Sequence, residues 1–195
     1  MSRRVKRLLD IVVAATSLVV LAPLIVAIAV VVRVAMGSPV FFRQVRPGLR
    51  GEAFELVKFR TMGREGDGDG RLLSDRERIS PLGRLMRRTS LDELPQLWNI
   101  LIGDMSLVGP RPLLFEYLPR YSAEQARRLE MKPGLTGWAQ VHGRGLVQWP
   151  ERFALDVWYV DHWSLGLDLT ILTLTVKMVI RGEGVEGRGR WTGGD

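Results

Sequence analysis

Residues 11–32 read IVVAATSLVVLAPLIVAIAVVV, an apolar run without a charged side chain. At about 1.5 Å per residue, a helix of this length reaches roughly 33 Å, enough to cross the hydrocarbon core of a bilayer. Pro23 lies in the middle, where it removes a backbone hydrogen bond and bends the helix. A cleaved signal peptide is less favoured, because the run is too long and no clear small-x-small cleavage site follows it. The run therefore predicts a bent membrane helix.

The positive charge of the chain gathers on both sides of this run. The 195 residues carry a net charge of +7, and residues 1–50 account for all of it, with one acid, Asp10, and eight basic residues: Arg3, Arg4, Lys6, Arg7, Arg33, Arg43, Arg46 and Arg50. Because the rest of the chain is neutral overall, this pattern favours anionic membrane lipids as partners and argues against nucleic acid. A crossing helix keeps its basic residues on one side, so basic flanks at both ends favour a re-entrant helix. A proline-kinked span stays as the alternative.

Other residue types exclude several kinds of site. The chain has no cysteine, which rules out disulfides, thiolate metal sites and thiol nucleophiles. Its two histidines, His142 and His162, are too far apart in sequence to suggest a histidine metal site. Asp67 and Asp69 alternate in GREGDGDGR, but the ligand pattern of a calcium loop does not continue, so a solvated loop is predicted.

The remaining sequence predicts short strands and several helices. Residues 39–62 read as two β-rich stretches around a turn at Pro47-Gly48, with Phe41 and Phe42 placed at the membrane interface. Residues 132–145 are turn-rich and strand-like. Apolar spacing predicts helices over residues 75–102, 122–131, 151–163 and 167–181, of which the last two are apolar and aromatic enough to lie at an interface.

Two adjacent carboxylates, Asp92 and Glu93, stand ahead of another apolar run. One interpretation is structural, because Ser90 followed three residues later by Glu93 matches a helix capping box. Pro95 fits poorly inside a helix, so the helix is expected to begin near Leu94 and to leave both acids outside it. The two interpretations are compatible, since a cap also fixes a side chain in place.

Basic residues and glycines indicate a phosphate-binding site. Arg111 stands between two prolines that restrict its backbone, so its guanidinium can be aimed with a smaller loss of entropy. The other candidates are cations near the acidic pair or in the strand region, and glycines that permit close approach of a bulky ligand: Lys58, Arg60, Arg87, Arg88, Gly134, Gly137, Gly143 and Gly145.

Four segments together resemble the bacterial sugar transferases, specifically the small monotopic polyprenyl-phosphate phosphoglycosyl transferases. They are KRLLDIVVAATSLVVLAPL, FELVKFRTM, TSLDELPQLWNILIGDMSLVGPRPLL and KPGLTGWAQVHGR, in the order of the family. The resemblance runs from about Lys6 to Arg181 and is specific, because chance agreement over four separate motifs is negligible. It implies a compact, helix-rich α/β core with a re-entrant helix broken at Pro23 and amphipathic helices in the interface.

The resemblance also implies a reaction: a sugar-1-phosphate moves from a UDP-sugar to polyprenyl phosphate, and UMP is released. Asp92 corresponds to the nucleophile that forms an aspartyl-phosphosugar, and Glu93 to its acid/base partner. The family uses Mg2+, here at Asp92, which offsets repulsion between the nucleophile and the pyrophosphate. Residues expected to bind the substrates are Lys58, Arg87 and Arg111 on the phosphates, Gln140 and Arg144 at the nucleotide sugar, and Asp156 and Asp168 from the C-terminal motif.

The resemblance predicts the setting as well. It implies domains at 1–36 (membrane helix), 37–182 (catalytic) and 183–195 (flexible tail), on the cytosolic face of the bacterial inner membrane. Expected partners are the UDP-sugar, polyprenyl phosphate, membrane lipids and downstream glycosyltransferases. Where the family commonly reads GWAQVNGRN this chain has His142 and Gly145, and LLFEYLPRYSAEQARR and LDVWYVDHWSL resemble the subgroup that uses N-acetylated amino sugars. The competing hypothesis is a non-catalytic membrane scaffold of a glycan-assembly complex.

Overall fold

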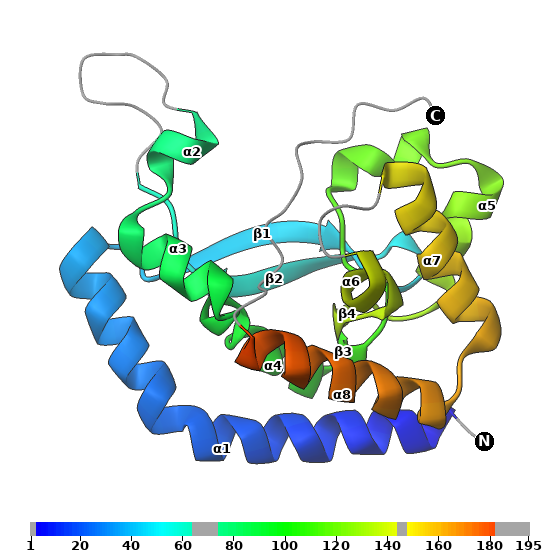
Figure 1. The fold of residues 1–195 in the computed structure, drawn as a ribbon, viewed down its shortest axis with the longest axis horizontal. Helices are drawn as coiled ribbons and strands as arrows, with labels where there is room; N and C mark the ends of the chain where they lie inside the picture. Colours follow the sequence, from blue (N-terminus) through cyan, green and yellow to red (C-terminus); the bar gives the residue numbers. More distant parts are fainter. Residues whose placement is uncertain (1–2, 64–73, 144–147, 182–195) are drawn as a thin grey trace.

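A computed structural model describes residues 3–63, 74–143 and 148–181. The first element, α1 (Arg3–Met36), is long and apolar enough to cross a membrane and contains Pro23. Figure 1 shows that α1 is bent: its first half runs beneath α4 and α8, and its second half turns away toward α3. The proline-kinked helix predicted from residues 11–32 is therefore present.

The rest of the described chain folds into helices around two small sheets. In order, the elements are β1 (Phe41–Pro47), η1 (Leu49–Gly51), β2 (Ala53–Phe59), α2 (Asp75–Arg78), α3 (Pro81–Arg88), η2 (Leu91–Glu93), α4 (Gln96–Ile102), β3 (Ser106–Val108), η3 (Phe115–Arg120), α5 (Ala123–Ala126), η4 (Arg127–Glu130), β4 (Gly134–Thr136), α6 (Trp138–Gly143), α7 (Trp149–His162) and α8 (Leu165–Ile180). The fold is thus mixed and helix-rich, as predicted.

Polar side chains anchor the first half of α1 to the core. Lys6 Nζ lies 2.6 Å from Asp168 Oδ2 on α8, and both side chains are buried. Arg7 donates to backbone carbonyls in the last turn of α4, where the helix dipole favours a cation. The Asp10 carboxylate accepts a hydrogen bond from the backbone N–H of Leu107 at 3.0 Å. Three polar side chains therefore fix this half of the membrane helix to the same body that carries α4, β3 and α8.

The second half of α1 is anchored to the hairpin. Val32 is fully buried in a cluster with Phe59 of β2 and Met86 of α3. The Arg60 guanidinium donates to the carbonyls of Met36 and of the residues that follow it, which satisfies acceptors at the end of the helix. Both ends of α1 therefore contact the folded domain.

Strands β1 and β2 form an antiparallel hairpin, as the Pro47-Gly48 turn predicted. Arg50 and Gly51 adopt positive φ values of 56° and 81° in the turn. On the outer edge of β2, the Asn99 side chain of α4 donates to the carbonyl of Glu55 at 2.7 Å and accepts from the N–H of Val57 at 3.1 Å. This amide bridge fixes α4, and the acidic pair that precedes it, against the hairpin.

A second, parallel pair joins β3 and β4 in the centre of the molecule. The two strands are flanked by glycines that approach each other closely: a Cβ atom on Gly134 would lie 2.1 Å from the backbone nitrogen of Gly109. Only glycine fits this contact. It places the segment after β3, which includes Arg111, beside the segment that leads to α6.

Two predictions about secondary structure are corrected. The helix expected over residues 75–102 is divided into α2, α3, η2 and α4. Pro81 begins a new helix, and Ser90 ends the helical path with a left-handed conformation (φ 57°). Pro95 is then the N-cap residue of α4. Within its described part, residues 132–143, the stretch predicted to be strand-like contains a three-residue strand and continues as α6, whose first turn donates hydrogen bonds to the carbonyl of Gly137. The predicted loop at Asp67 and Asp69 and the tail at 183–195 lie outside the described residues.

Candidate active site

The acidic pair lies in η2, between α3 and α4. Ser90 is left-handed and its hydroxyl makes no capping hydrogen bond, so the capping box is wrong. The helix α4 begins at Gln96, with Pro95 as its N-cap residue, and both acids are outside it, as the position of Pro95 predicted. Asp92 and Glu93 are therefore held by the structure around them rather than used to begin a helix.

Asp92 is a nearly buried carboxylate facing several cations. Its exposed fraction is 5%. Burial raises the pKa of Asp92, and the neighbouring charge of Glu93 raises it further. Lys58, Arg87 and Arg111 act in the opposite direction and lower this pKa. Three of the predicted phosphate-binding residues therefore come together at the predicted nucleophile, although they lie on three different segments of the chain.

Two of the cations near Asp92 each have a close neighbour. Burial lowers the pKa of Lys58, while the charge of Asp92 opposes this shift. The Lys58 ammonium lies 5.4 Å from the ring centre of Phe42. On α3, Arg87 donates from Nε to the hydroxyl of buried Thr61 at 3.0 Å. These residues place positive charge near one buried carboxylate, which suits an anionic substrate.

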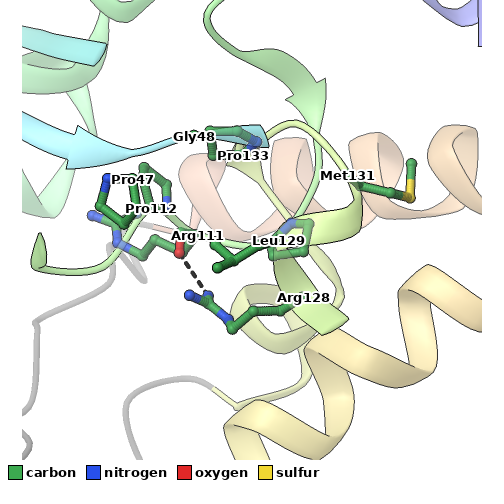
Figure 2. Close-up of a pocket in the computed structure, with 9 residues that line it drawn as sticks. Pro47, Gly48, Arg111, Pro112, Arg128, Leu129, Met131 and Pro133 are labelled. Carbon is green, nitrogen blue, oxygen red and sulfur yellow. Dashed lines mark hydrogen bonds between the residues drawn. The ribbon is translucent and has the colours of Figure 1, made fainter. Parts of the chain in front are cut away.

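The third cation, Arg111, is fixed from both ends. Its guanidinium donates to Glu93 Oε1 at 2.6 Å, and this contact, together with the Glu93 charge, raises the pKa of Arg111. Its backbone carbonyl accepts a hydrogen bond from buried Arg128 at 2.7 Å, as the dashed line in Figure 2 shows. Arg128 in turn pairs with Asp156 at 2.6 Å. Asp156 therefore reaches the site indirectly, through Arg128 and the Arg111 backbone.

Arg46 is a further buried cation near Arg111 that was not predicted from the sequence. Burial and the charge of Arg111 lower the pKa of Arg46 to about 10. In β1 it follows Phe42 and Gln44 at two-residue spacing, so these three side chains share one face of the strand. Lys58 is the cross-strand partner of Phe42. The signal was present in the sequence: alternation across a hairpin predicts that Arg46 and Lys58 face the same side.

Other predicted site residues have different surroundings. Asp168 contacts Lys6, Tyr159 and Trp163, none of which is among the charged groups facing Asp92. Gln140 donates to the carbonyl of Leu135 at 3.0 Å. Within the described residues its buried Oε1 has no hydrogen-bond partner.

The remaining predicted site residues lie at the end of α1, at the surface, or outside the described residues. Arg60 holds the end of α1, and Arg88 is exposed. His142 is exposed, with its ring 3.6 Å from that of Trp138. Arg144 and Gly145 lie outside the described residues, so their predicted roles at the nucleotide sugar stay predictions.

The donor atoms of the site fit Mg2+ held mainly by a substrate. In the described ranges no group of three His, Cys, Asp or Glu side chains converges on one point. Mg2+ in phosphoryl-transfer sites is bound by one or two carboxylates together with substrate phosphates and water. Asp92 supplies one such carboxylate, and the nearby cations supply the phosphate contacts.

Comparison with known proteins identifies the family. The family model described as bacterial sugar transferase matches residues 1–182. An uncharacterized sugar transferase, EpsL, of Bacillus subtilis (strain 168) is 56% identical over 93% of this chain and 90% of its own length. The UDP-glucose:undecaprenyl-phosphate glucose-1-phosphate transferase of Caulobacter vibrioides is 43% identical over 90% of this chain and 69% of its own length.

A longer relative aligns over part of its own length. The undecaprenyl-phosphate galactose phosphotransferase of Salmonella typhimurium is 40% identical over 94% of this chain, which spans 42% of that protein. All three alignments cover at least 90% of this chain. The resemblance predicted from the four motifs is therefore confirmed: this chain belongs to the bacterial sugar transferase family.

Proposed function

We propose that this chain transfers a sugar-1-phosphate from a UDP-sugar to undecaprenyl phosphate and releases UMP, as the first membrane step of lipid-linked glycan assembly. The observation that carries the proposal is the nearly buried Asp92 carboxylate surrounded by Lys58, Arg87 and Arg111. Relatives named for glucose-1-phosphate and galactose transfer to the same lipid carrier support the reaction class. A UDP-linked N-acetylated amino sugar is our proposed donor, to be tested in a panel with UDP-glucose and UDP-galactose.

In the proposed first step, a carboxylate oxygen of Asp92 attacks the phosphorus that carries the sugar. A new P–O bond forms to Asp92, the bond to the bridging oxygen breaks, and UMP leaves with that oxygen and the electron pair. Lys58, Arg87 and Arg111 stabilise negative charge on the transferred group. In the second step, an oxygen of the lipid phosphate attacks the same phosphorus, and the Asp92 carboxylate leaves.

We assign Glu93 two tasks. One oxygen orients Arg111 through the 2.6 Å ion pair, and the other accepts the proton of the lipid phosphate in the second step. When bound at Asp92, Mg2+ supplies further charge neutralisation for the phosphates. The protein residues align the transferred phosphorus with Asp92 and hold the anionic substrate in a partly buried site.

The half-reaction without acceptor tests this route. Purified protein incubated with the correct UDP-sugar alone is expected to release at most about one UMP per site and to gain the mass of one sugar phosphate, because Asp92 needs no lipid for the first step. Intact-protein mass spectrometry after rapid quenching measures the adduct, and added undecaprenyl phosphate should discharge it. Lipid-dependent turnover without an adduct would instead indicate direct transfer between the substrates. No turnover with any donor would favour the non-catalytic scaffold.

The pH dependence of kcat/KM is expected to be bell-shaped. The acid limb should lie above the ordinary range of aspartate, because burial raises the pKa of Asp92 and only the ionised carboxylate attacks. The alkaline limb should lie below the ordinary range of lysine, because burial lowers the pKa of Lys58. Lys58→Met is expected to move the acid limb to still higher pH, to remove the alkaline limb, and to cut turnover by about 100-fold. An unchanged acid limb would contradict the assignment; Arg43→Met, on the exposed face of β1, is the control.

We also propose that α1 is re-entrant and that both of its ends face the cytosol. Its first half is anchored at Lys6 and Asp10, and its second half at Val32 and by Arg60. A straight helix of this length that crossed the bilayer would separate its ends by the full membrane thickness. Because both ends of α1 contact one folded domain, we propose that the helix bends at Pro23 and returns to the side of the membrane from which it entered. The basic residues on both flanks agree with this topology.

Single-cysteine labelling measures this topology, because the chain has no native thiol. Cysteines at Ser2 and Ser38 are expected to react alike in intact cells: both protected from a membrane-impermeant maleimide, and both labelled after permeabilisation. Labelling at Ser2 alone in intact cells would show that the helix crosses. Pro23→Leu is the informative second variant, since restoring the missing hydrogen bond should favour the straight, crossing helix.

A further inference from the structure

One corner of the candidate active site combines a cation with an aromatic ring that faces outward. Lys58 Nζ lies 5.4 Å from the centre of the Phe42 ring. The two residues are cross-strand partners in the hairpin, so their side chains emerge on the same face. Phe42 keeps 38% of its surface exposed. The cation nearest this ring is therefore one of those that face the reactive carboxylate.

Apolar contacts continue from this corner to the membrane helix. Phe41, which is also 38% exposed, stacks on Phe59 with ring centres 5.3 Å apart. Phe59 is fully buried and packs in one cluster with Val32 of α1. Strand β1 follows closely after the end of α1, so the two exposed rings stand where the chain leaves the membrane helix. Val40, two residues before Phe42, packs against the same cluster. Apolar side chains therefore lead from α1 to the strand that carries the ring beside Lys58, while Phe41, the neighbour of Phe42 in the strand, points to the opposite face of the hairpin.

We infer that Phe42 and Lys58 form part of the subsite for the lipid acceptor, with its phosphate on Lys58 and the first isoprene unit of its tail on the Phe42 ring. The inference rests on the proposed function. An isoprenoid phosphate has one anionic end and one apolar end, and this corner presents a cation and an apolar surface in that order from Asp92 outward. The direction also fits, because the apolar side continues into the helix that enters the lipid.

The sugar nucleotide fits this corner less well. A UDP-sugar is polar along its whole length and arrives from water, so it gains nothing from an exposed phenyl ring on the strand that follows a membrane helix. The acceptor cannot leave the bilayer with its tail, so its phosphate must reach Asp92 from the membrane side. Lys58 is the cation that combines contact with an exposed ring and proximity to Asp92.

The experiment compares the two substrates in the full-length protein reconstituted in lipid nanodiscs. Phe42→Ser is expected to raise the KM for undecaprenyl phosphate about tenfold, the equivalent of about 1.4 kcal/mol. The KM for the UDP-sugar and the amount of sugar-phosphate adduct formed without lipid should stay at wild-type values. Phe42→Leu, which restores an apolar side chain, should recover most of the acceptor affinity.

Phe115→Ser is the matched control, because Phe115 has nearly the same exposed fraction, 39%, but lies in η3. It should leave both KM values unchanged, and a thermal melt checks that every variant is folded. An unchanged acceptor KM in Phe42→Ser, or an equal rise in the donor KM, would overturn the acceptor subsite while wild-type turnover still supports the proposed function. Absence of turnover by the wild-type protein with every donor would overturn the proposed function itself.

Discussion

Asp92→Asn is expected to lower kcat by about 1000-fold or more while leaving the melting temperature at neutral pH unchanged or higher. Removal of a nucleophile typically costs several orders of magnitude in rate. Asparagine has nearly the same volume but no negative charge with which to attack phosphorus. UMP release with both substrates measures the first effect, and a thermal melt at the same pH measures the second.

The expected stability follows from the direction of the pKa shift. Burial and Glu93 raise the pKa of Asp92 in the folded state. A group shifted in this direction contributes stability that is present below its unfolded pKa and is lost as pH rises through the folded pKa. At neutral pH the ionised carboxylate therefore costs folding free energy, which asparagine removes. Because the structure shows no capping hydrogen bond in this turn, loss of a helix cap does not complicate the comparison.

The exposed Asp161→Asn is the control for this pair of measurements, and it should leave turnover unchanged. Substantial activity in Asp92→Asn would contradict the covalent role. A large fall in melting temperature would instead show that Asp92 stabilises the fold through its cations. Melts over a pH series extend the test: the stability of the wild type relative to Asp92→Asn should decline as pH rises above the ordinary pKa of a carboxyl group.

The largest loss of stability is expected from Asp156→Asn. Asp156 and Arg128 are each 2% exposed at the side chain, with 2.6 Å between their charged atoms. Removing one partner of a buried pair leaves an uncompensated charge, which costs about 3–5 kcal/mol. Arg128 also holds the carbonyl of Arg111, so catalysis should weaken with it. Chemical denaturation with a linear extrapolation measures the free energy of unfolding.

Two comparisons make this prediction specific. Asp161 lies on the same helix, α7, and pairs with Arg127 at the surface, so Asp161→Asn should cost less than about 1 kcal/mol. The double variant Asp156→Leu, Arg128→Met removes both buried charges and should recover much of the lost stability, because burial of the pair is itself costly. Turnover should remain low in the double variant, since the Arg111 carbonyl has lost its donor. Equal stability losses in Asp156→Asn and Asp161→Asn would contradict the interpretation.

Regular patterns in the sequence predicted the long elements and the main charges of the site. The uncharged run around Pro23 predicted the bent helix, and apolar spacing predicted α7 and α8. The spacing of Ser90 and Glu93 predicted a capping box that does not form. A capping box requires an extended backbone at its first residue, and Ser90 is left-handed. Local sequence does not reveal that conformation, which depends on how η2 is packed between α3 and α4.

Contacts between distant segments could not be predicted from the sequence alone. Arg128 and Asp156 are separated by 28 positions, and nothing in the spacing indicates that they pair beneath Arg111. Lys6 and Asp168 are 162 positions apart. Both acids were predicted from family motifs as substrate-binding residues, but a motif does not distinguish a carboxylate that touches a ligand from one that holds a neighbouring element. Arg46, by contrast, was accessible from strand alternation.

The anchoring of α1 at both ends has a consequence for how the enzyme responds to its lipid. A helix that spans a bilayer must match the hydrophobic thickness of both leaflets, and it tilts or distorts the membrane when the match is poor. The re-entrant helix that we propose, held to the folded domain at Lys6 and by Arg60, would instead depend on a single leaflet. In that arrangement the protein would set the height of Asp92 above the lipid tails, so activity is expected to stay the same in nanodiscs of thicker and thinner lipids.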